Sequence, residues 1–157
     1  MKTFISGFLV GAVVVAVAIW FIMPGLMLNV LPSKYDFPTT MEKIEDEIYN
    51  QGWDIQRVYD MQECLNNNDF PGMTPIQILS ICKPSHANEI LQDDRNKKVT
   101  AIMPCRIGVY EDSNGQVWIS SMNMGLLGKM FGGVIKEVIS HSAVEEKKIL
   151  APVLQEK

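Results

Sequence analysis

Two cysteines, each close to a proline, are the residues of this sequence best suited to reactive chemistry. Cys82 is followed by Lys83 and Pro84, and Cys105 directly follows Pro104. Proline is common in the first turn of a helix, so Cys82 is expected just before a helix amino terminus. The partial positive charge there lowers the pKa of a thiol and favours the reactive thiolate. The sequence therefore makes Cys82 a candidate nucleophile or persulfide carrier.

Three basic side chains complete the candidate thiol site. Lys83 and His86 are close to Cys82 in sequence, and Arg106 follows Cys105. A simpler interpretation makes both cysteines small buried apolar residues, a common environment for a free thiol. His86 would then face solvent or cap its short helix. The sequence leaves both interpretations open.

A disulfide bond between Cys82 and Cys105 is not expected. Cys82 ends its strand, whereas Cys105 lies within the next one, and parallel strands would separate their Cα atoms beyond the limit of roughly 7 Å. The third cysteine is Cys64. With an odd number of cysteines, at least one thiol stays unpaired.

Two methionines raise a third hypothesis, a soft-metal site. Met122 and Met124 place two thioethers at alternate positions beside the predicted hairpin strand, and thioethers with a thiolate select Cu(I). Methionine more often fills gaps in a core, and the cysteines and histidines lack the spacing of zinc ligands. We therefore predict no metal and no cofactor. Without a catalytic triad, a carboxylate pair or a phosphate-binding loop, a binding protein is favoured over an enzyme.

The length of 157 residues fits one domain with an appendage. Thr39 and Glu42 match a capping box and open a helix that ends at Gly52, and Asn114-Gly115 is typical of a tight hairpin. Strands are expected over 53–60, 76–82, 99–111 and 117–122, and helices over 61–65, 85–92 and 134–149. The pattern predicts an α+β fold, a small mixed or antiparallel sheet with packed helices, preceded by one N-terminal transmembrane helix. The net charge of −4 argues against nucleic-acid binding.

The N-terminal segment is apolar, with no charged residue over 3–33. About 20 apolar residues cross a bilayer, so residues 1–25 predict a single-pass anchor that Pro24-Gly25 ends. A cleaved signal peptide is the alternative interpretation. Lys2 favours an inside amino terminus, which places the domain on the periplasmic face of the inner membrane. Gly7 and Gly11 form a small-residue pair for packing on other membrane subunits or on a second copy.

Three stretches carry a family resemblance: the helix that ends at Gly52-Trp53, the phrase from Ile78 to Pro84, and the phrase from Met103 to Gly115 and Val117. Together they resemble the bacterial and archaeal domain-of-unknown-function family 302. The resemblance covers about residues 28–131, and its most specific phrase runs from Met103 to Gly115 and Val117. It implies an α+β fold and no established activity, and it implies that Cys82 and Cys105 occupy the paired cysteine positions of the family. On this basis we divide the chain into an anchor (1–25), an α+β domain (26–133) and a C-terminal amphipathic helix and tail (134–157).

The expected function is that of an accessory or binding protein outside the cytoplasm. Some relatives are associated with sulfur or respiratory redox metabolism, so the resemblance implies a non-catalytic partner or subunit of a redox membrane complex. The alternatives are a thiol or persulfide carrier that uses Cys82 with Cys105, and a Cu(I)-binding protein.

Overall fold

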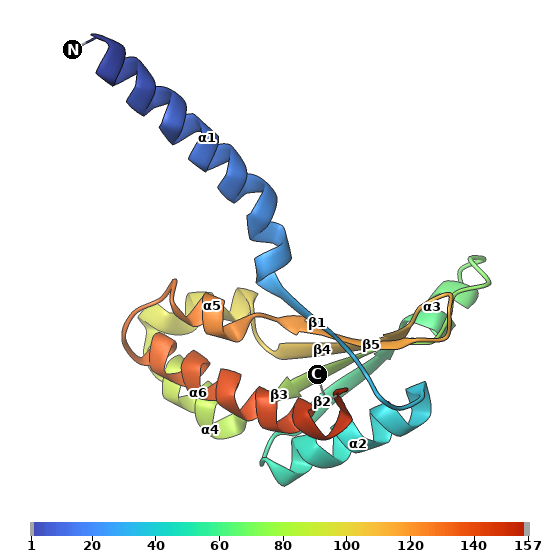
Figure 1. Cartoon of the computed structure of the whole chain (residues 1–157). Coiled ribbons are helices and arrows are strands. Elements are labelled where there is room, and N and C mark those ends of the chain that lie inside the picture. The colour runs from blue at the N-terminus through green and yellow to red at the C-terminus, as the bar shows by residue number, and fades with distance from the viewer. Residues whose placement is uncertain (1, 156–157) are drawn as a thin grey trace.

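The computed structural model describes the fold of residues 2–155, with side chains from residue 11 onward. Within this range five strands form one antiparallel sheet, in the order β1-β5-β4-β3-β2 (Figure 1). The strands are β1 (Leu28–Pro32), β2 (Asp54–Asp60), β3 (Ile76–Cys82), β4 (Cys105–Glu111) and β5 (Val117–Met122). The α+β class thus agrees with the structure.

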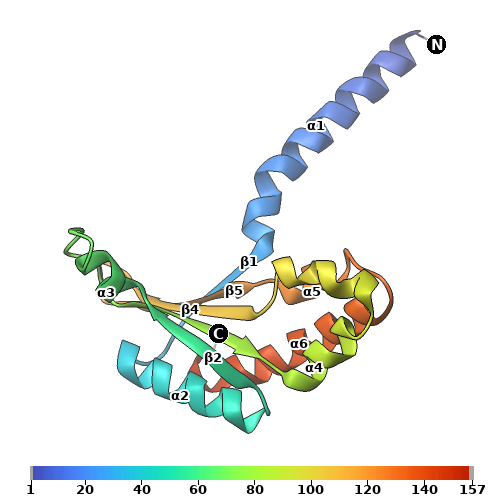
Figure 2. The same cartoon turned by 180° about the vertical axis from the view of Figure 1, so that it is seen from behind.

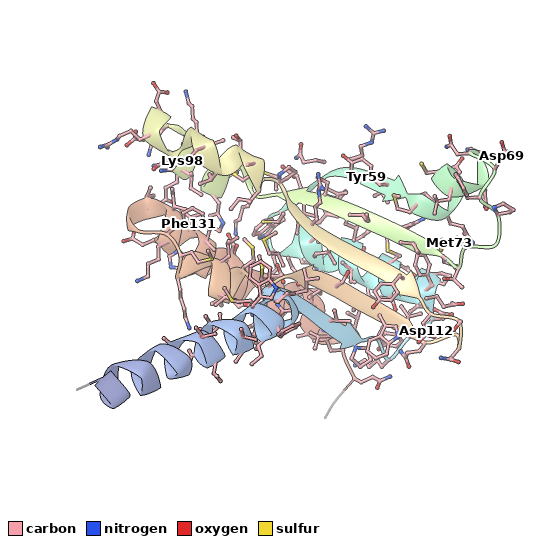
Figure 3. All side chains as sticks on the ribbon, turned by 90° about the horizontal axis from the view of Figure 1, so that it is seen from above. Tyr59, Asp69, Met73, Lys98, Asp112 and Phe131 are labelled. Carbon is pink, nitrogen blue, oxygen red and sulfur yellow. The ribbon has the colours of Figure 1, made fainter. Side chains whose placement is uncertain are left out.

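The helices surround the sheet unevenly. They are α1 (Lys2–Met27), α2 (Phe37–Asn50), α3 (Met61–Asn66), α4 (Pro84–Leu91), α5 (Met124–Gly128) and α6 (Gly133–Leu150), with the 3-10 helices η1 (Asp94–Ala101) and η2 (Ala151–Val153). One face of the sheet carries α2 and α6, while α4 and α5 lie beyond one end and α3 at the other (Figure 1, and from behind in Figure 2). In Figure 3, Lys98 and Phe131 mark the end with α4 and α5, and Asp69 and Met73 mark the opposite end.

The main core lies between the sheet and the two helices α2 and α6. Its fully buried members alternate along the strands, because successive side chains of a strand point to opposite faces. They include Leu79, Ile107 and Ile119 from the sheet, Ile44 from α2 and Ile149 from α6. Since α6 contributes to this core, the C-terminal segment is packed into the domain. Its end is fastened too, because the Lys34 amide donates a 3.0 Å hydrogen bond to the Val153 carbonyl.

A second apolar cluster fills the space beyond the strand ends. It joins α4, η1, α5 and the first half of α6 around Ile90, Val99 and Ile139. Val99 is thus in a 3-10 helix, and the expected strand over 99–111 begins only at Cys105. The apolar residues before Cys105 serve helix packing, and an apolar run alone does not distinguish that from a buried strand.

The prediction of a transmembrane anchor is contradicted. A crossing needs about 20 consecutive residues of sufficiently apolar helix, and no helix in the described part of the chain is long and apolar enough. The same finding contradicts the predictions that depended on this anchor: the single pass, the inside amino terminus, the inner-membrane localisation and the partner contacts through this helix. Pro24 also does not end α1, which continues to Met27.

The packing pair predicted at Gly7 and Gly11 concerns a contact with another chain and stays a prediction. The side-chain surroundings of Gly7 lie outside the described residues, and a Cβ built on Gly11 meets no atom within 4 Å. The helix α1 extends away from the sheet (Figure 1). Its last turn is tied down by Asn123, whose amide donates a 2.8 Å hydrogen bond to the Met27 carbonyl.

The burial of α6 predicts that its C-terminal half is essential for stability. Ile149 is 0 % exposed, so Ile149→Ala should lower the free energy of unfolding by about 2–5 kcal/mol, the usual cost of such a cavity. Val144, 55 % exposed on the same helix, provides the control, and Val144→Ala should change it by less than about 0.5 kcal/mol. Urea titration followed by tryptophan fluorescence measures both. Equal effects would mean that α6 does not belong to the core.

Candidate functional site

The antiparallel sheet brings the two candidate thiols to the same end of the sheet, which we call the thiol end. Cys82 is the last residue of β3 and Cys105 is the first residue of β4, and Ile81 pairs with Cys105. The expected separation of the cysteines assumed parallel strands and is therefore wrong, since antiparallel strands place the end of one beside the start of the next. Cys64, Cys82 and Cys105 are all free thiols.

Cys82 is not activated in the way that its position suggested. Burial raises the pKa of the Cys82 thiol, and the nearby Asp54 carboxylate raises it further. Lys83 does not offset this, because its ammonium lies 2.6 Å from Glu145 Oε1 and also donates to the Gln51 carbonyl at 3.1 Å. The expected lowering by the helix terminus is thus outweighed by desolvation and a like charge.

Cys105 is even further from ionisation. Burial raises the pKa of Cys105 to about 12, and the carboxylate of Glu146 and the Cys82 thiol add to the shift. Both thiols are therefore protonated at neutral pH. A protonated thiol is a poor nucleophile, because the thiolate is the reactive form.

A polar network joins α6 to the beginning of α4. Glu145 on α6 accepts hydrogen bonds from Lys83 Nζ at 2.6 Å and from Trp53 Nε1 at 3.0 Å. Burial alone would raise the pKa of Glu145, but these two bonds outweigh it and hold the pKa below its usual value. His86 Nδ1 lies 3.2 Å from Ser142 Oγ, also on α6. The charged and polar side chains of this network are thus hydrogen-bonded to one another.

His86 is part of this packing. Its side chain is only 17 % exposed, and its ring packs edge-on against Trp53 at 5.8 Å between centroids. The expectation that His86 faces solvent or caps its helix is therefore wrong. Burial lowers the pKa of His86, against the opposing effect of Glu145. The ring is thus neutral at pH 7.

A small cavity, which we call the inner cavity, lies beneath this network. Its volume is about 50 Å³ and its walls include Trp53, Cys82, His86, Met103 and Cys105. One water molecule needs about 10–15 Å³ of such space. The inner cavity therefore has room for a few water molecules and none for a substrate of ordinary size.

A larger cavity, which we call the fork cavity, lies where β4 and β5 separate. The two strands pair from Glu111 with Val117 as far as Ile107 with Ser121. Beyond that point β4 continues along β3, whereas Met122 of β5 pairs with Leu28 of β1. The resulting fork encloses a cavity of about 310 Å³.

The walls of the fork cavity are mixed in character. Its lining residues are Leu28, Ala101, Ile102, Met103, Pro104, Cys105, Arg106, Ser120, Ser121, Met122, Met124 and Glu146. Glu146 is the one acidic residue among them. Burial raises the pKa of Glu146, and the Ser121 hydroxyl, which donates to its Oε1 at 2.7 Å, lowers it in part.

The structure thus divides the predicted site residues between two cavities. Cys82, Lys83 and His86 line the inner cavity, Arg106, Met122 and Met124 line the fork cavity, and Met124 and Cys105 line both. Met122 ends β5 and Met124 begins α5, and the side chain of Asn123 between them caps that helix. Arg106 is exposed and lies in the outer row of β4.

Four important residues were missed from the sequence: Met103, Trp53, Glu145 and Glu146. A signal for Glu145 exists in α6. Val138, Ser142, Glu145 and Ile149 follow the spacing of a buried helical stripe, so polar residues interrupt an otherwise apolar face. Such interruptions indicate that the stripe faces a polar cluster or a cavity.

The polar network predicts a pH-dependent contribution of Glu145 to stability. Because its pKa is lowered in the folded state, this contribution is present above the ordinary value of 4.5 and is lost as the pH falls through the folded pKa. Glu145→Gln should therefore lower the free energy of unfolding by about 1–3 kcal/mol at pH 7, and by less at pH 3. Urea unfolding at both pH values measures the difference.

Glu137→Gln is the matched control, since Glu137 is exposed on the same helix. It should leave stability unchanged at both pH values. A Glu145→Gln effect of equal size at pH 7 and pH 3 would contradict the role of the carboxylate charge.

Comparison with known proteins agrees with this fold. Residues 29–156 match the family model "Domain of unknown function DUF302", which continues through α6 beyond the residues on which the resemblance rested. The crystal structure of the uncharacterized conserved protein DUF302 from Bacillus stearothermophilus is similar, with a TM-score of 0.67 and 23 % identity, over 81 % of this chain and 95 % of that one. No curated protein matches significantly. The chain therefore belongs to the DUF302 family of domains of unknown function.

Proposed function

We propose that this chain is a non-catalytic binding protein whose ligand occupies the fork cavity. The observation that carries this proposal is the separation of β4 from β5, which leaves about 310 Å³ open between them. Small-molecule sites usually have volumes of about 300–1,000 Å³ and combine apolar walls with a few polar groups. The fork cavity fits this description, since its polar side chains are Arg106, Ser120, Ser121 and Glu146 among apolar walls.

The chemistry of Cys82 and Cys105, at the thiol end of the sheet, supports binding over catalysis. Cys82 and Cys105 both have raised pKa values, so neither supplies a thiolate at neutral pH. Lys83 and Glu145 neutralise each other, and His86 is neutral and hydrogen-bonded to Ser142. Neither thiol is therefore poised as a nucleophile. The redox partner that the family resemblance implied stays a prediction.

One observation favours the alternative of a thiol or persulfide carrier. Cys82 and Cys105 end and begin adjacent strands and both line the inner cavity, so a sulfur atom could pass between them. A carrier needs an accessible thiolate on its first cysteine. Cys82, with its raised pKa, does not meet this condition.

The rate of alkylation separates the two functions. Cys82 should react with iodoacetamide at pH 7.5 more slowly than Cys64, the exposed thiol of the same chain, because little of it is thiolate. Peptide mass spectrometry over a time course measures both rates in one sample. In urea the two cysteines should react alike. If Cys82 reacts faster than Cys64 in the folded protein, the carrier replaces our proposal.

Ligand binding can be tested by blocking the mouth of the fork cavity. Ala101 is exposed and lines this cavity, so Ala101→Trp should fill its entrance without disturbing the core. A library of fluorinated small fragments, screened by ¹⁹F NMR, should contain binders of the wild type that this variant loses.

Asn68→Trp is the control, because Asn68 is exposed in the loop after α3, at the other end of the sheet. It should retain every binder. Circular dichroism establishes that both variants are folded. Binders that Ala101→Trp retains, or a wild type without binders, would contradict the proposal.

A further inference from the structure

Four sulfur-containing side chains line the fork cavity, two from the stretch Met103-Pro104-Cys105 and two from the stretch Met122-Asn123-Met124. Cys105 comes from β4, Met122 from the end of β5, Met124 from the start of α5, and Met103 from the segment before β4. All four also belong to the second apolar cluster, so they lie within one packed region. Sequence proximity accounts for each pair, and the fold brings the two pairs to one cavity.

We propose that the fork cavity binds one Cu(I) ion through the Cys105 sulfur and the thioethers of Met103, Met122 and Met124. This inference rests on the proposed function, since it names the ligand of the same cavity. Thiolate and thioether sulfurs are soft ligands that select Cu(I). In the part of the chain that the structure describes, no three His, Cys, Asp or Glu residues are grouped as metal ligands. The sulfur set therefore differs from the donor sets of zinc or calcium sites.

The empty space argues that these methionines do more than fill a core. Methionine usually occupies irregular gaps because its side chain is flexible and polarisable. Here Met103, Met122 and Met124 border a cavity of about 310 Å³ that they do not fill. A flexible thioether beside free space can turn its sulfur inward, and donors on both arms of the fork can then reach one ion.

The charge balance of binding is simple. The Cys105 thiol loses its proton to solvent and forms a sulfur–copper bond, so the uptake of one Cu(I) ion releases one proton and involves no change of oxidation state. The burial that opposes a free thiolate does not oppose a thiolate neutralised by a cation. Glu146 adds an acidic group to the same walls, and Arg106 is exposed, where solvent screens its charge.

Competition with the chromophoric Cu(I) chelator bicinchoninate, without oxygen, tests the proposal on the full chain. The Cys64→Ser background removes the exposed thiol. This protein should take up one Cu(I) per chain, and X-ray absorption should find sulfur as its principal ligand. Met122→Leu, which nearly preserves volume, should weaken binding by about tenfold or more, which corresponds to about 1.4 kcal/mol. Cys105→Ala should weaken it further.

Met130→Leu is the matched control, because Met130 is 66 % exposed and does not line the cavity. It should bind Cu(I) like the background protein. The copper site would be overturned if Met122→Leu and Cys105→Ala bound Cu(I) as tightly as the Cys64→Ser background. It would also be overturned if the replacement of Cys64 alone abolished Cu(I) binding. If the protein takes up no copper but Ala101→Trp still abolishes fragment binding, the copper inference fails and the binding function stands.

Discussion

The separation of β4 from β5 depends on two strand pairings, because each of the two strands is paired there with a different outer neighbour. The start of β4 is held to β3, where Cys105 pairs with Ile81, and the end of β5 is held to β1, where Met122 pairs with Leu28. Asn123 strengthens the second connection with hydrogen bonds to the last turn of α1, at 2.8 Å and 2.9 Å. Where the two strands part, β4 remains paired with β3 and β5 remains paired with β1. Few backbone hydrogen bonds are therefore lost by their separation. The fork cavity is the consequence.

The helix α6 completes the site because it carries both apolar and polar residues on its buried side. Ile149 packs in the main core, Glu145 binds Lys83 next to the start of α4, and Glu146 lines the fork cavity. Glu145 uses its charge on Lys83 and Trp53, which fixes α6 against the start of α4. Glu146 is held by Ser121 alone among the described side chains and remains next to open space. One helix thus provides a closed polar cluster and an open wall.

The sequence predicted the local elements better than the site. Asn114-Gly115 forms the expected turn, with Gly115 at a φ of 82°, and β3 is paired on both sides as its apolar faces indicated. The start of α2 was placed late, because Asp36 and not Thr39 caps it. The fork was out of reach, since it depends on the register of three strand pairs. The alternation of a single strand does not contain that information.

The cysteines illustrate the same limit for chemistry. Cys82 was correctly placed at the end of its strand, but Cys105 was expected within the strand over 99–111 and instead begins β4. The two cysteines lie on adjacent strand ends because β3 and β4 are antiparallel. The reactivity of Cys82 could not be predicted, because the raised pKa reflects burial and Asp54, a residue 28 positions away in sequence.

Xenon-pressure NMR with ¹³C-methyl methionine tests the existence of the fork cavity most directly, because xenon enters preformed apolar space. The account predicts that the Met122 signal shifts while that of exposed Met130 does not. If the Met103 and Met124 signals shift but the Met122 signal does not, xenon enters the inner cavity and not the fork cavity, which contradicts the account.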